Sequence, residues 1–377
     1  MLAYASVVAL SRYIPYLADR PRRLWFGARH TDHDRNSAVE RGLGFIADAA
    51  SDPKHFTEWG QDLMWCFYTI TNTAKNTRLR EMACNVGQER ARQWRRQFVE
   101  PPTNNVDALS RFVFGTDIAD KLLGNSDDAM RRRIQTAVQR FSALDFLAFD
   151  PLHEPPPADL PEECPVCENR SPRRVTACSK CNTPLEFRSP YDIWLDALVT
   201  TYSGDAYGVQ LGASYPEVLR WISAMRPYAL PDGANREQFE DVSYAITHIV
   251  YTLNDYGKYR LSPAWLPQEF KYLKAHISEA ERYQDWETLG EFLDTLRAFG
   301  LDESDPEIQV GVDYLLSHQN PDGSWGDMED SDIYNRYHST WTAIDGLREY
   351  AFQGEQLRLP HLLPLIRGDA AHAKASG

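Results

Sequence analysis

Two segments of the chain carry a histidine, an aromatic residue and an aspartate at the same spacing. The two sets are His248, Tyr251 and Asp255, and His338, Trp341 and Asp345. Offsets of three and seven residues bring side chains to one face of an α-helix. Imidazole and carboxylate groups act as general acids and bases, and both bind divalent metal ions. Each segment is therefore predicted to be a helix with one face equipped for chemistry.

The two sets belong to an internal repeat. A Pro-Asp-Gly sequence precedes each histidine at the same offset, at 231–233 and 321–323. Proline presets one dihedral angle and glycine supplies a positive φ, so each sequence predicts a turn ahead of a helix. Between the copies, Asp294-Thr295-Leu296 aligns with 251–253, which places Glu291 at the position of the histidines. The unit is roughly 45 residues, one helix pair.

The second copy resembles two related protein families. Residues 319–326, Gln-Asn-Pro-Asp-Gly-Ser-Trp-Gly, are similar to the repeat of squalene and oxidosqualene cyclases. Residues 337–347, which begin Tyr-His and end Asp-Gly-Leu, are similar to a stretch of protein prenyltransferase β subunits. The resemblance is specific from about 305 to 350 and extends more weakly back to 226. Both families are α/α-toroids, in which inner helices surround a central cavity and outer helices cover them.

A toroid implies that His248, Glu291 and His338 reach one cavity from three consecutive inner helices. Two imidazoles and a carboxylate match a facial Fe(II) site or an open catalytic zinc site. The prenyltransferase resemblance supports His338, because that family has a zinc-ligating histidine there. The family's Asp-x-Cys zinc ligands have only Asp241-Val242-Ser243 as a counterpart, and its diphosphate-binding basic residues are not reproduced. Protein prenyl transfer is therefore not expected.

The predicted function is a metal-dependent enzyme that transforms a largely apolar, isoprenoid-like small molecule. Tyr251 and Trp341 are predicted to bind this substrate, and Asp255, Asp294 and Tyr337 are the candidates for proton transfer. One alternative is a metal-free terpenoid cyclase or isomerase with a carboxylic acid of raised pKa, although the Asp-x-Asp-Asp motif of such cyclases is not found. Another is a scaffold without activity. The histidines also fit a repeat signature that packs beneath an aromatic residue without metal.

Four cysteines predict a second site. They form two Cys-x-x-Cys pairs, Cys164 with Cys167 and Cys178 with Cys181. This spacing is typical of a zinc ribbon, in which four thiolates surround one zinc ion. A complete thiolate shell leaves no open position for catalysis, which favours a structural zinc over a redox site. Docking of a partner protein on the ribbon is the functional alternative.

Composition limits the classes of partner. The formal net charge of −14 over 377 residues opposes binding to a nucleic-acid backbone. No apolar run is long enough for a membrane span. Residues 1–18 have no basic start or cleavage site, and the paired cysteines suit a reducing compartment, so a cytoplasmic protein is predicted. Basic residues at 20–29 and 131–133 are interpreted as solvated.

We therefore predict an all-α protein, an α/α-toroid of about five to six helix pairs. Its parts are helix pairs at 1–150, a proline-rich linker with the zinc ribbon at 151–188, further helix pairs at 189–360 and a tail at 361–377. Apolar periodicity predicts helices within 79–98, 108–123, 130–147, 191–202 and 215–225. His30 and His33 could hold a metal between them, but polar segments of this kind are common without one.

Overall fold

The computed structural model describes residues 31–230 and 233–368. Within these ranges the chain forms helices and no sheet, and four isolated β-bridges are its only extended pairings. The all-α prediction is confirmed. The predicted helix at 1–18, the basic segment 20–29, His30, the Pro231-Asp232 half of the first turn and the end of the tail lie outside the described residues.

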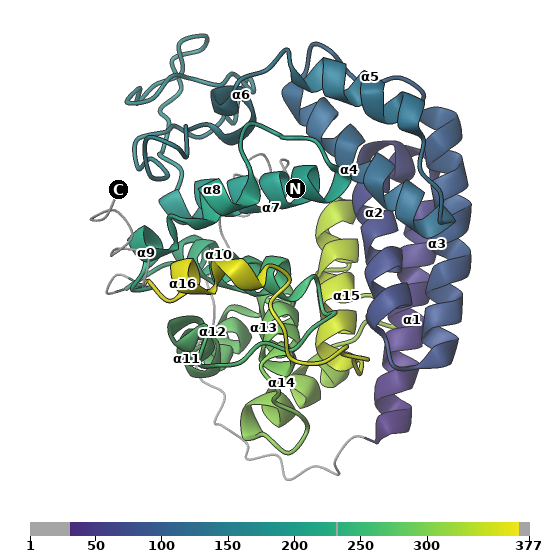
Figure 1. Ribbon diagram of the computed structural model, residues 1–377. Helices are drawn as coiled ribbons and strands as arrows, with labels where there is room; N and C mark the ends of the chain where they lie inside the picture. The colour runs from purple at the N-terminus through teal and green to yellow at the C-terminus, as the bar shows by residue number, and fades with distance from the viewer. Residues whose placement is uncertain (1–30, 231–232, 369–377) are drawn as a thin grey trace.

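The longest stretch without a helix in the described residues is 148–189 (Figure 1), and shorter ones occur at 255–266, 318–332 and 348–359. In chain order they are α1 (Asp32–Ser51), α2 (Pro53–Thr73), α3 (Thr77–Gln97), α4 (Val106–Leu123), α5 (Asp128–Val138), α6 (Ala143–Leu147), α7 (Pro190–Tyr207), α8 (Tyr215–Leu219), α9 (Ile222–Met225), α10 (Arg236–Asn254), α11 (Pro267–Ala275), α12 (Ile277–Tyr283), α13 (Trp286–Ala298), α14 (Pro306–Ser317), α15 (Ile333–Leu347), the 3₁₀ helix η3 (Pro360–Leu362) and α16 (Leu363–Ile366). The helices predicted within the described residues are present, and two of the predicted segments, 130–147 and 215–225, are each divided into two helices.

Six helices pack against one another in sequence order. The pairs in contact are α2 with α4, α4 with α7, α7 with α10, α10 with α13, α13 with α15, and α15 with α2. The other long helices lie against neighbouring members of this series. Helix α3 contacts α2 and α4, α1 contacts α2 and α15, and α14 contacts α13 and α15.

Burial along the helices distinguishes these two groups. Residues are buried without interruption from Val242 to Asn254 in α10 and from Thr288 to Ala298 in α13. Helix α14 buries only Ile308, Gly311, Val312 and Leu315, which is a single stripe. A helix with one buried stripe has solvent on its other face, whereas a helix buried all round has neighbours on every side. Helices α10 and α13 are therefore internal and α14 is peripheral.

The turn predicted at 321–323 is confirmed, and it anchors α14 to its surroundings. Gly323 has a φ of +92°, and Asp322 Oδ1 accepts a hydrogen bond from the Ser324 N–H at 3.0 Å. Trp325 is completely buried, and its indole N–H donates to the Leu315 carbonyl at 2.8 Å. A Cβ atom at position 323 would lie 2.6 Å from the Arg41 carbonyl oxygen. The positive φ and the contact with α1 both require glycine there.

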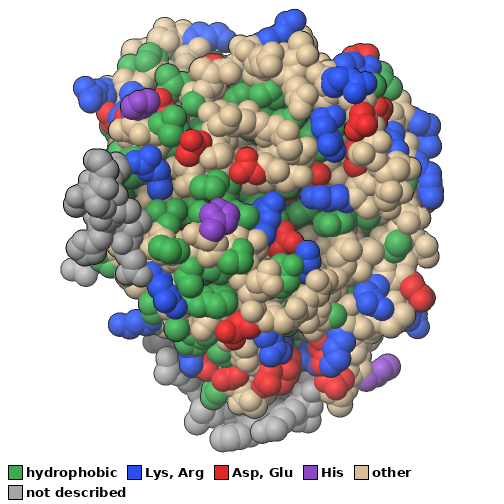
Figure 2. All heavy atoms as spheres, in the orientation of Figure 1, with side chains coloured by type: hydrophobic (Ala, Val, Ile, Leu, Met, Phe, Trp, Pro, Cys, Tyr) green, Lys and Arg blue, Asp and Glu red, His purple; other side chains and the backbone are tan. Residues whose placement is uncertain are grey.

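The C-terminal part of the described chain is packed rather than free. Ile366 in α16 is completely buried, and its carbonyl accepts a hydrogen bond from Arg226 Nη1 at 2.6 Å. The same arginine pairs with the buried carboxylate of Glu269. On the outside, basic and acidic side chains are interspersed over the face in Figure 2. No helix in the described ranges is long and apolar enough to cross a membrane.

Helices α13 and α15 approach each other until their backbones touch. A Cβ atom on Gly290 would lie 2.4 Å from the Thr342 carbonyl oxygen, and one on Gly346 would lie 2.9 Å from the Gly290 carbonyl oxygen. Real Cβ atoms do not come this close to backbone atoms, so any larger residue must separate the helices. These two glycines set the spacing between α13 and α15.

We expect Gly290→Ala to lower the free energy of unfolding by about 1–3 kcal/mol, because the added methyl group forces the two backbones apart. Chemical denaturation measures this change. Gly44→Ala is the matched control, since a Cβ at that helical position meets nothing within 4 Å. The control is expected to raise stability by up to about 1 kcal/mol through helix propensity. Equal stability of wild type and Gly290→Ala would show that the helix contact is not tight.

Candidate functional site

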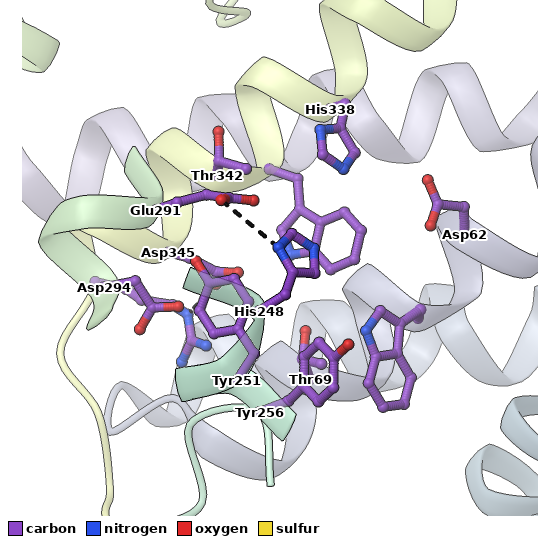
Figure 3. A pocket seen from close by; sticks show the side chains of 13 residues that line it. Asp62, Thr69, His248, Tyr251, Tyr256, Glu291, Asp294, His338, Thr342 and Asp345 are labelled. Carbon is purple, nitrogen blue, oxygen red and sulfur yellow. Dashed lines mark hydrogen bonds and ion pairs between the residues drawn. The ribbon is translucent and has the colours of Figure 1, made fainter. Parts of the chain in front are cut away.

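A cavity lies among α2, α10, α13 and α15 (Figure 3). The centres of water molecules can occupy about 40 Å³ of it, which is room for about three waters. Its lining combines ionisable and aromatic side chains. These are Asp62, Trp65, Thr69, His248, Tyr251, Tyr256, Glu291, Asp294, His338, Trp341, Thr342, Asp345 and Arg348. Six predicted site residues are thus brought together: His248, Tyr251, Glu291, Asp294, His338 and Trp341.

His248 is held in a single protonation state by its own helix. Its Nδ1 atom lies 2.9 Å from the Tyr244 carbonyl oxygen, which can only accept a hydrogen bond. Nδ1 therefore carries the proton, and Nε2 carries the lone pair. Burial lowers the pKa of His248 to about 4, partly offset by that bond to the Tyr244 carbonyl. At neutral pH His248 is an uncharged imidazole.

His338 has the opposite charge state. Burial by itself lowers the pKa of His338, but the Glu287 carboxylate lies 3.0 Å from Nδ1 and raises it to about 9. Both side chains are largely buried, so the pair is weakly screened by solvent. His338 is therefore an imidazolium ion at neutral pH. The two histidines, equivalent in the repeat, differ because a carboxylate lies 3.0 Å from Nδ1 of His338, whereas the carboxylate nearest Nδ1 of His248 lies 4.0 Å away.

Glu291 is directed toward α10 and not toward a shared ion site. Its Oε2 atom accepts a hydrogen bond from the Thr247 hydroxyl at 2.5 Å and lies 4.0 Å from His248 Nδ1. Burial and the nearby Glu287 raise the pKa of Glu291 well above its ordinary value. Among the described residues, the four ribbon cysteines form the only group of three or more metal-ligating side chains whose ligand atoms all lie within 4.8 Å of one another. The predicted set of His248, Glu291 and His338 thus shares the cavity without converging on one point.

Two carboxyl groups and one guanidinium form the end of the cavity near Asp294. Arg348 Nε donates to Asp345 Oδ1 at 2.6 Å. Burial, together with the neighbouring Asp345, raises the pKa of Asp294 to about 7, against the opposing effect of Arg348. Asp294 Oδ1 is buried and has no hydrogen-bond partner in the described chain. This carboxyl group has the pKa of a proton-transfer group at neutral pH.

Aromatic rings make up the other walls. Tyr256 lies between Trp65 and Tyr251, with ring centroids 4.8 Å and 5.6 Å away respectively. The indole N–H of Trp65 is buried without a hydrogen-bond partner. The Trp341 N–H lies near Asp345 but makes no well-aligned hydrogen bond. The cavity therefore offers apolar faces with buried polar groups that lack protein partners.

Two predicted site residues lie outside the cavity lining. Asp255 ends α10 with a φ of +57° and accepts a hydrogen bond from the Tyr202 hydroxyl at 2.8 Å. The left-handed backbone turns this side chain away from the face that carries His248. Tyr337 is completely buried, and its hydroxyl donates to Asp62 Oδ2 at 2.9 Å. Tyr337 therefore positions a lining residue without being one, and His33 is exposed at the start of α1.

The sequence did not identify the site residues of α2 or the glutamate in the first turn of α13. Asp62, Trp65 and Thr69 share one face of α2 by their spacing, but no repeat motif marks that helix. Glu287, one turn before Glu291, was not recognised as the partner of His338. The spacing of Glu287 and Glu291 on one helix face was the available signal.

The four ribbon cysteines form the compact cluster that their spacing predicted. Sγ of Cys164 lies 3.4 Å from Sγ of Cys181, and Sγ of Cys167 lies 3.5 Å from those of Cys178 and Cys181. The two knuckles repeat one hydrogen-bond pattern, in which Glu168 N–H donates to the Cys164 carbonyl and Asn182 N–H to the Cys178 carbonyl. Apart from the cysteines, the local core contains only Leu185. A site of this kind is consistent with a structural zinc.

Comparisons with known proteins give no independent assignment. No protein-family model matches the chain, and neither the curated proteins nor the solved structures include a significant match. The site must therefore be interpreted from its own geometry.

The ribbon should hold about one zinc ion per chain. Cys164→Ser is expected to abolish zinc binding and lower the melting temperature, because one aliphatic side chain cannot stabilise the insert without metal. Elemental analysis and calorimetry measure the two effects. Cys84→Ser removes a half-buried thiol of α3, outside the cluster, and should keep the zinc. A metal-free quadruple cysteine variant with unchanged melting would reject a structural role.

Glu287→Gln is expected to lower the pKa of His338 below 6.5, because burial then acts with less opposition. Histidine NMR titration measures this pKa. In the wild type the folded state binds this proton more tightly than the unfolded chain, so the stabilisation is complete below pH 6.5 and is lost as pH rises through 9. Between pH 7 and 9, the free energy of unfolding of the variant should therefore decrease less than that of the wild type. An unchanged His338 pKa would disprove the pairing.

Proposed function

We propose that the chain is an α/α-toroid whose inner ring consists of α2, α4, α7, α10, α13 and α15. Support comes from the order of helix contacts, which returns from α15 to α2, and from the all-round burial of α10 and α13. The cavity then lies on the inside of this ring, because four of its helices contribute the lining. The predicted resemblance to cyclases and prenyltransferases of this fold agrees with that arrangement.

We further propose that the protein is an enzyme that moves protons at a small molecule held in this cavity, without a catalytic metal. The observation that carries this proposal is Asp294, a buried carboxyl group with an unpartnered oxygen beside a second carboxyl group. Such a group exchanges its proton near neutral pH, which ordinary aspartates do not. Reactions of this class include isomerisation, elimination and acid-initiated cyclisation.

The two histidines suit complementary supporting roles. His338 is an imidazolium ion, so it stabilises negative charge that develops on the substrate. His248 is neutral, with Nδ1 fixed by the Tyr244 carbonyl and Nε2 as an acceptor for a substrate hydroxyl or amine. Tyr251, Tyr256 and Trp341 provide apolar surface for the carbon skeleton. The volume of about 40 Å³ favours a molecule of a few heavy atoms over a long isoprenoid chain.

A catalytic divalent metal held by His248, Glu291 and His338 is the second candidate. The hydrogen bond from His248 Nδ1 to a backbone carbonyl supports it, because histidines that bind metal through Nε2 commonly make that bond. Against it, His338 would first have to lose its proton and Glu291 would have to leave Thr247. Histidine NMR spectra recorded with added Fe(II) or Zn(II), after the ribbon is loaded with zinc, distinguish the two candidates.

In protein labelled with ¹³C at the aspartate carboxyl carbon, we expect one buried signal to titrate with a pKa near 7 and to be absent from Asp294→Asn. Asp345→Asn should lower that pKa, because it removes the like charge beside Asp294 while Arg348 remains. Asp313→Asn, an exposed position on α14, should leave it unchanged. If Asp294 is still ionised below pH 5, the proposed proton-transfer role fails.

A further inference from the structure

The cavity lining contains more carboxyl groups than cationic side chains. Its lining has four carboxyl side chains, from Asp62, Glu291, Asp294 and Asp345. The two cationic side chains, Arg348 and His338, are already in contact with Asp345 and Glu287 respectively. Glu291 lies 4.0 Å from the neutral His248 and is within electrostatic reach of His338, whose nearest carboxylate is Glu287. Within the described residues, Asp62 and Asp294 form no ion pair. The cavity therefore has acidic groups without cationic partners.

This imbalance is greatest around Asp294. Asp345 and Arg348 face it from the end of α15 and the residue that follows, and Tyr251 faces it from α10. The Tyr350 hydroxyl also lies close to Asp294 but makes no well-aligned hydrogen bond. Arg297, on the same helix, forms its ion pair elsewhere, since Nη1 pairs with Glu303 at 2.9 Å and Nε donates to the Gly346 carbonyl. Its Nη2 atom is buried without a hydrogen-bond partner among the described residues, and Arg297 acts on Asp294 only through its charge. Two carboxyl groups thus share one guanidinium. One positive charge is missing for both to be ionised.

The walls beside this acidic end are of the kind that accepts organic cations. Tyr251 and Tyr256 stack at 5.6 Å, and the edge of Trp65 meets Tyr256 at 4.8 Å. Aromatic faces attract cations through their quadrupoles, most strongly where solvent is excluded. A carboxylate ligand at this end would instead meet Asp294 and Asp345, which have one guanidinium between them, and this disfavours it.

We propose that the cavity binds a small organic cation, a protonated amine with a short apolar body, whose ammonium group contacts Asp294 Oδ1 and whose carbon atoms lie against Tyr251, Tyr256 and Trp341. This inference rests on the proposed function and names its substrate class. A bound ammonium ion favours the ionised form of Asp294, so Asp294 acts as the base of the reaction and not as its acid.

Isothermal titration calorimetry of the zinc-loaded full chain tests this class with three probes of one shape. Isopentylamine carries a positive charge at pH 7.5, isopentanol is neutral and isovalerate is negative. We expect the amine to bind at least about tenfold more tightly than either of the others. Titration at pH 6.5 in two buffers with different heats of ionisation should also show proton release, because Asp294, with a pKa of about 7, is then mostly protonated and becomes ionised when the amine binds.

The variant Asp294→Asn should weaken amine binding by about tenfold or more, since a charged hydrogen-bond acceptor is replaced by a neutral one. Asp313→Asn makes the same chemical change at an exposed site on α14 and should leave the affinity unchanged. Circular dichroism of each variant confirms that it is folded before binding is measured.

Equal or tighter binding of isopentanol or isovalerate overturns the inference, as does undiminished amine binding by folded Asp294→Asn. No binding by any linear amine from methylamine to pentylamine or by isopentylamine overturns it as well. These outcomes are separate from failure of the proposed function, which depends on the carboxyl titration of Asp294 without ligand. If Asp294 titrates near pH 7 but the protein binds only the neutral or the anionic probe, the proposed proton-transfer function still stands and the inference of a cationic ligand is rejected.

Discussion

The backbone contact between α13 and α15 fixes the geometry on which the rest of the site depends. Gly290 and Gly346 allow the two helices to approach within van der Waals distance. Glu287, Glu291 and Asp294 on one helix then face His338, Trp341 and Asp345 on the other. At a wider helix spacing, water would enter between these groups and screen their charges. The electrostatic properties of the cavity therefore depend on glycine at positions 290 and 346, where a side chain would move the two helices apart.

Burial makes the small differences between neighbouring groups decisive. His248 and His338 occupy equivalent places in the repeat, yet their pKa values differ because Glu287 contacts only one of them. Asp294 and Asp345 are neighbouring carboxyl groups, yet only Asp345 takes the hydrogen bond from Arg348. In water these contacts would shift the pKa values little. Inside the protein they divide the side chains into a fixed cation, a neutral imidazole and a titrating acid.

The sequence predicted what depends on period and spacing. The helices, the turn at 321–323, the cysteine cluster and the shared location of His248, Glu291 and His338 all follow from such regularities. The sequence did not predict the side-chain positions that depend on a single backbone dihedral angle, or the site residues that come from segments outside the repeat. Asp255 leaves the expected face because a left-handed residue ends α10, and Asp62 comes from a helix without any repeat signature. The pairing of His338 with Glu287, rather than with Glu291, depends on rotamers that spacing does not determine.

Two hydrogen bonds between the N-terminal and C-terminal parts of the described chain have a consequence for folding during synthesis. Tyr337 donates a hydrogen bond to Asp62 across 275 positions of sequence, and Gln319 donates one to the Ala38 carbonyl across 281. Contacts this far apart cannot form until α15 has left the ribosome, and closing so long a loop is slow. Early helices must therefore wait with an apolar face uncovered while the remaining chain is made. Nascent chains of this protein should depend on chaperones at least until α15 has been made.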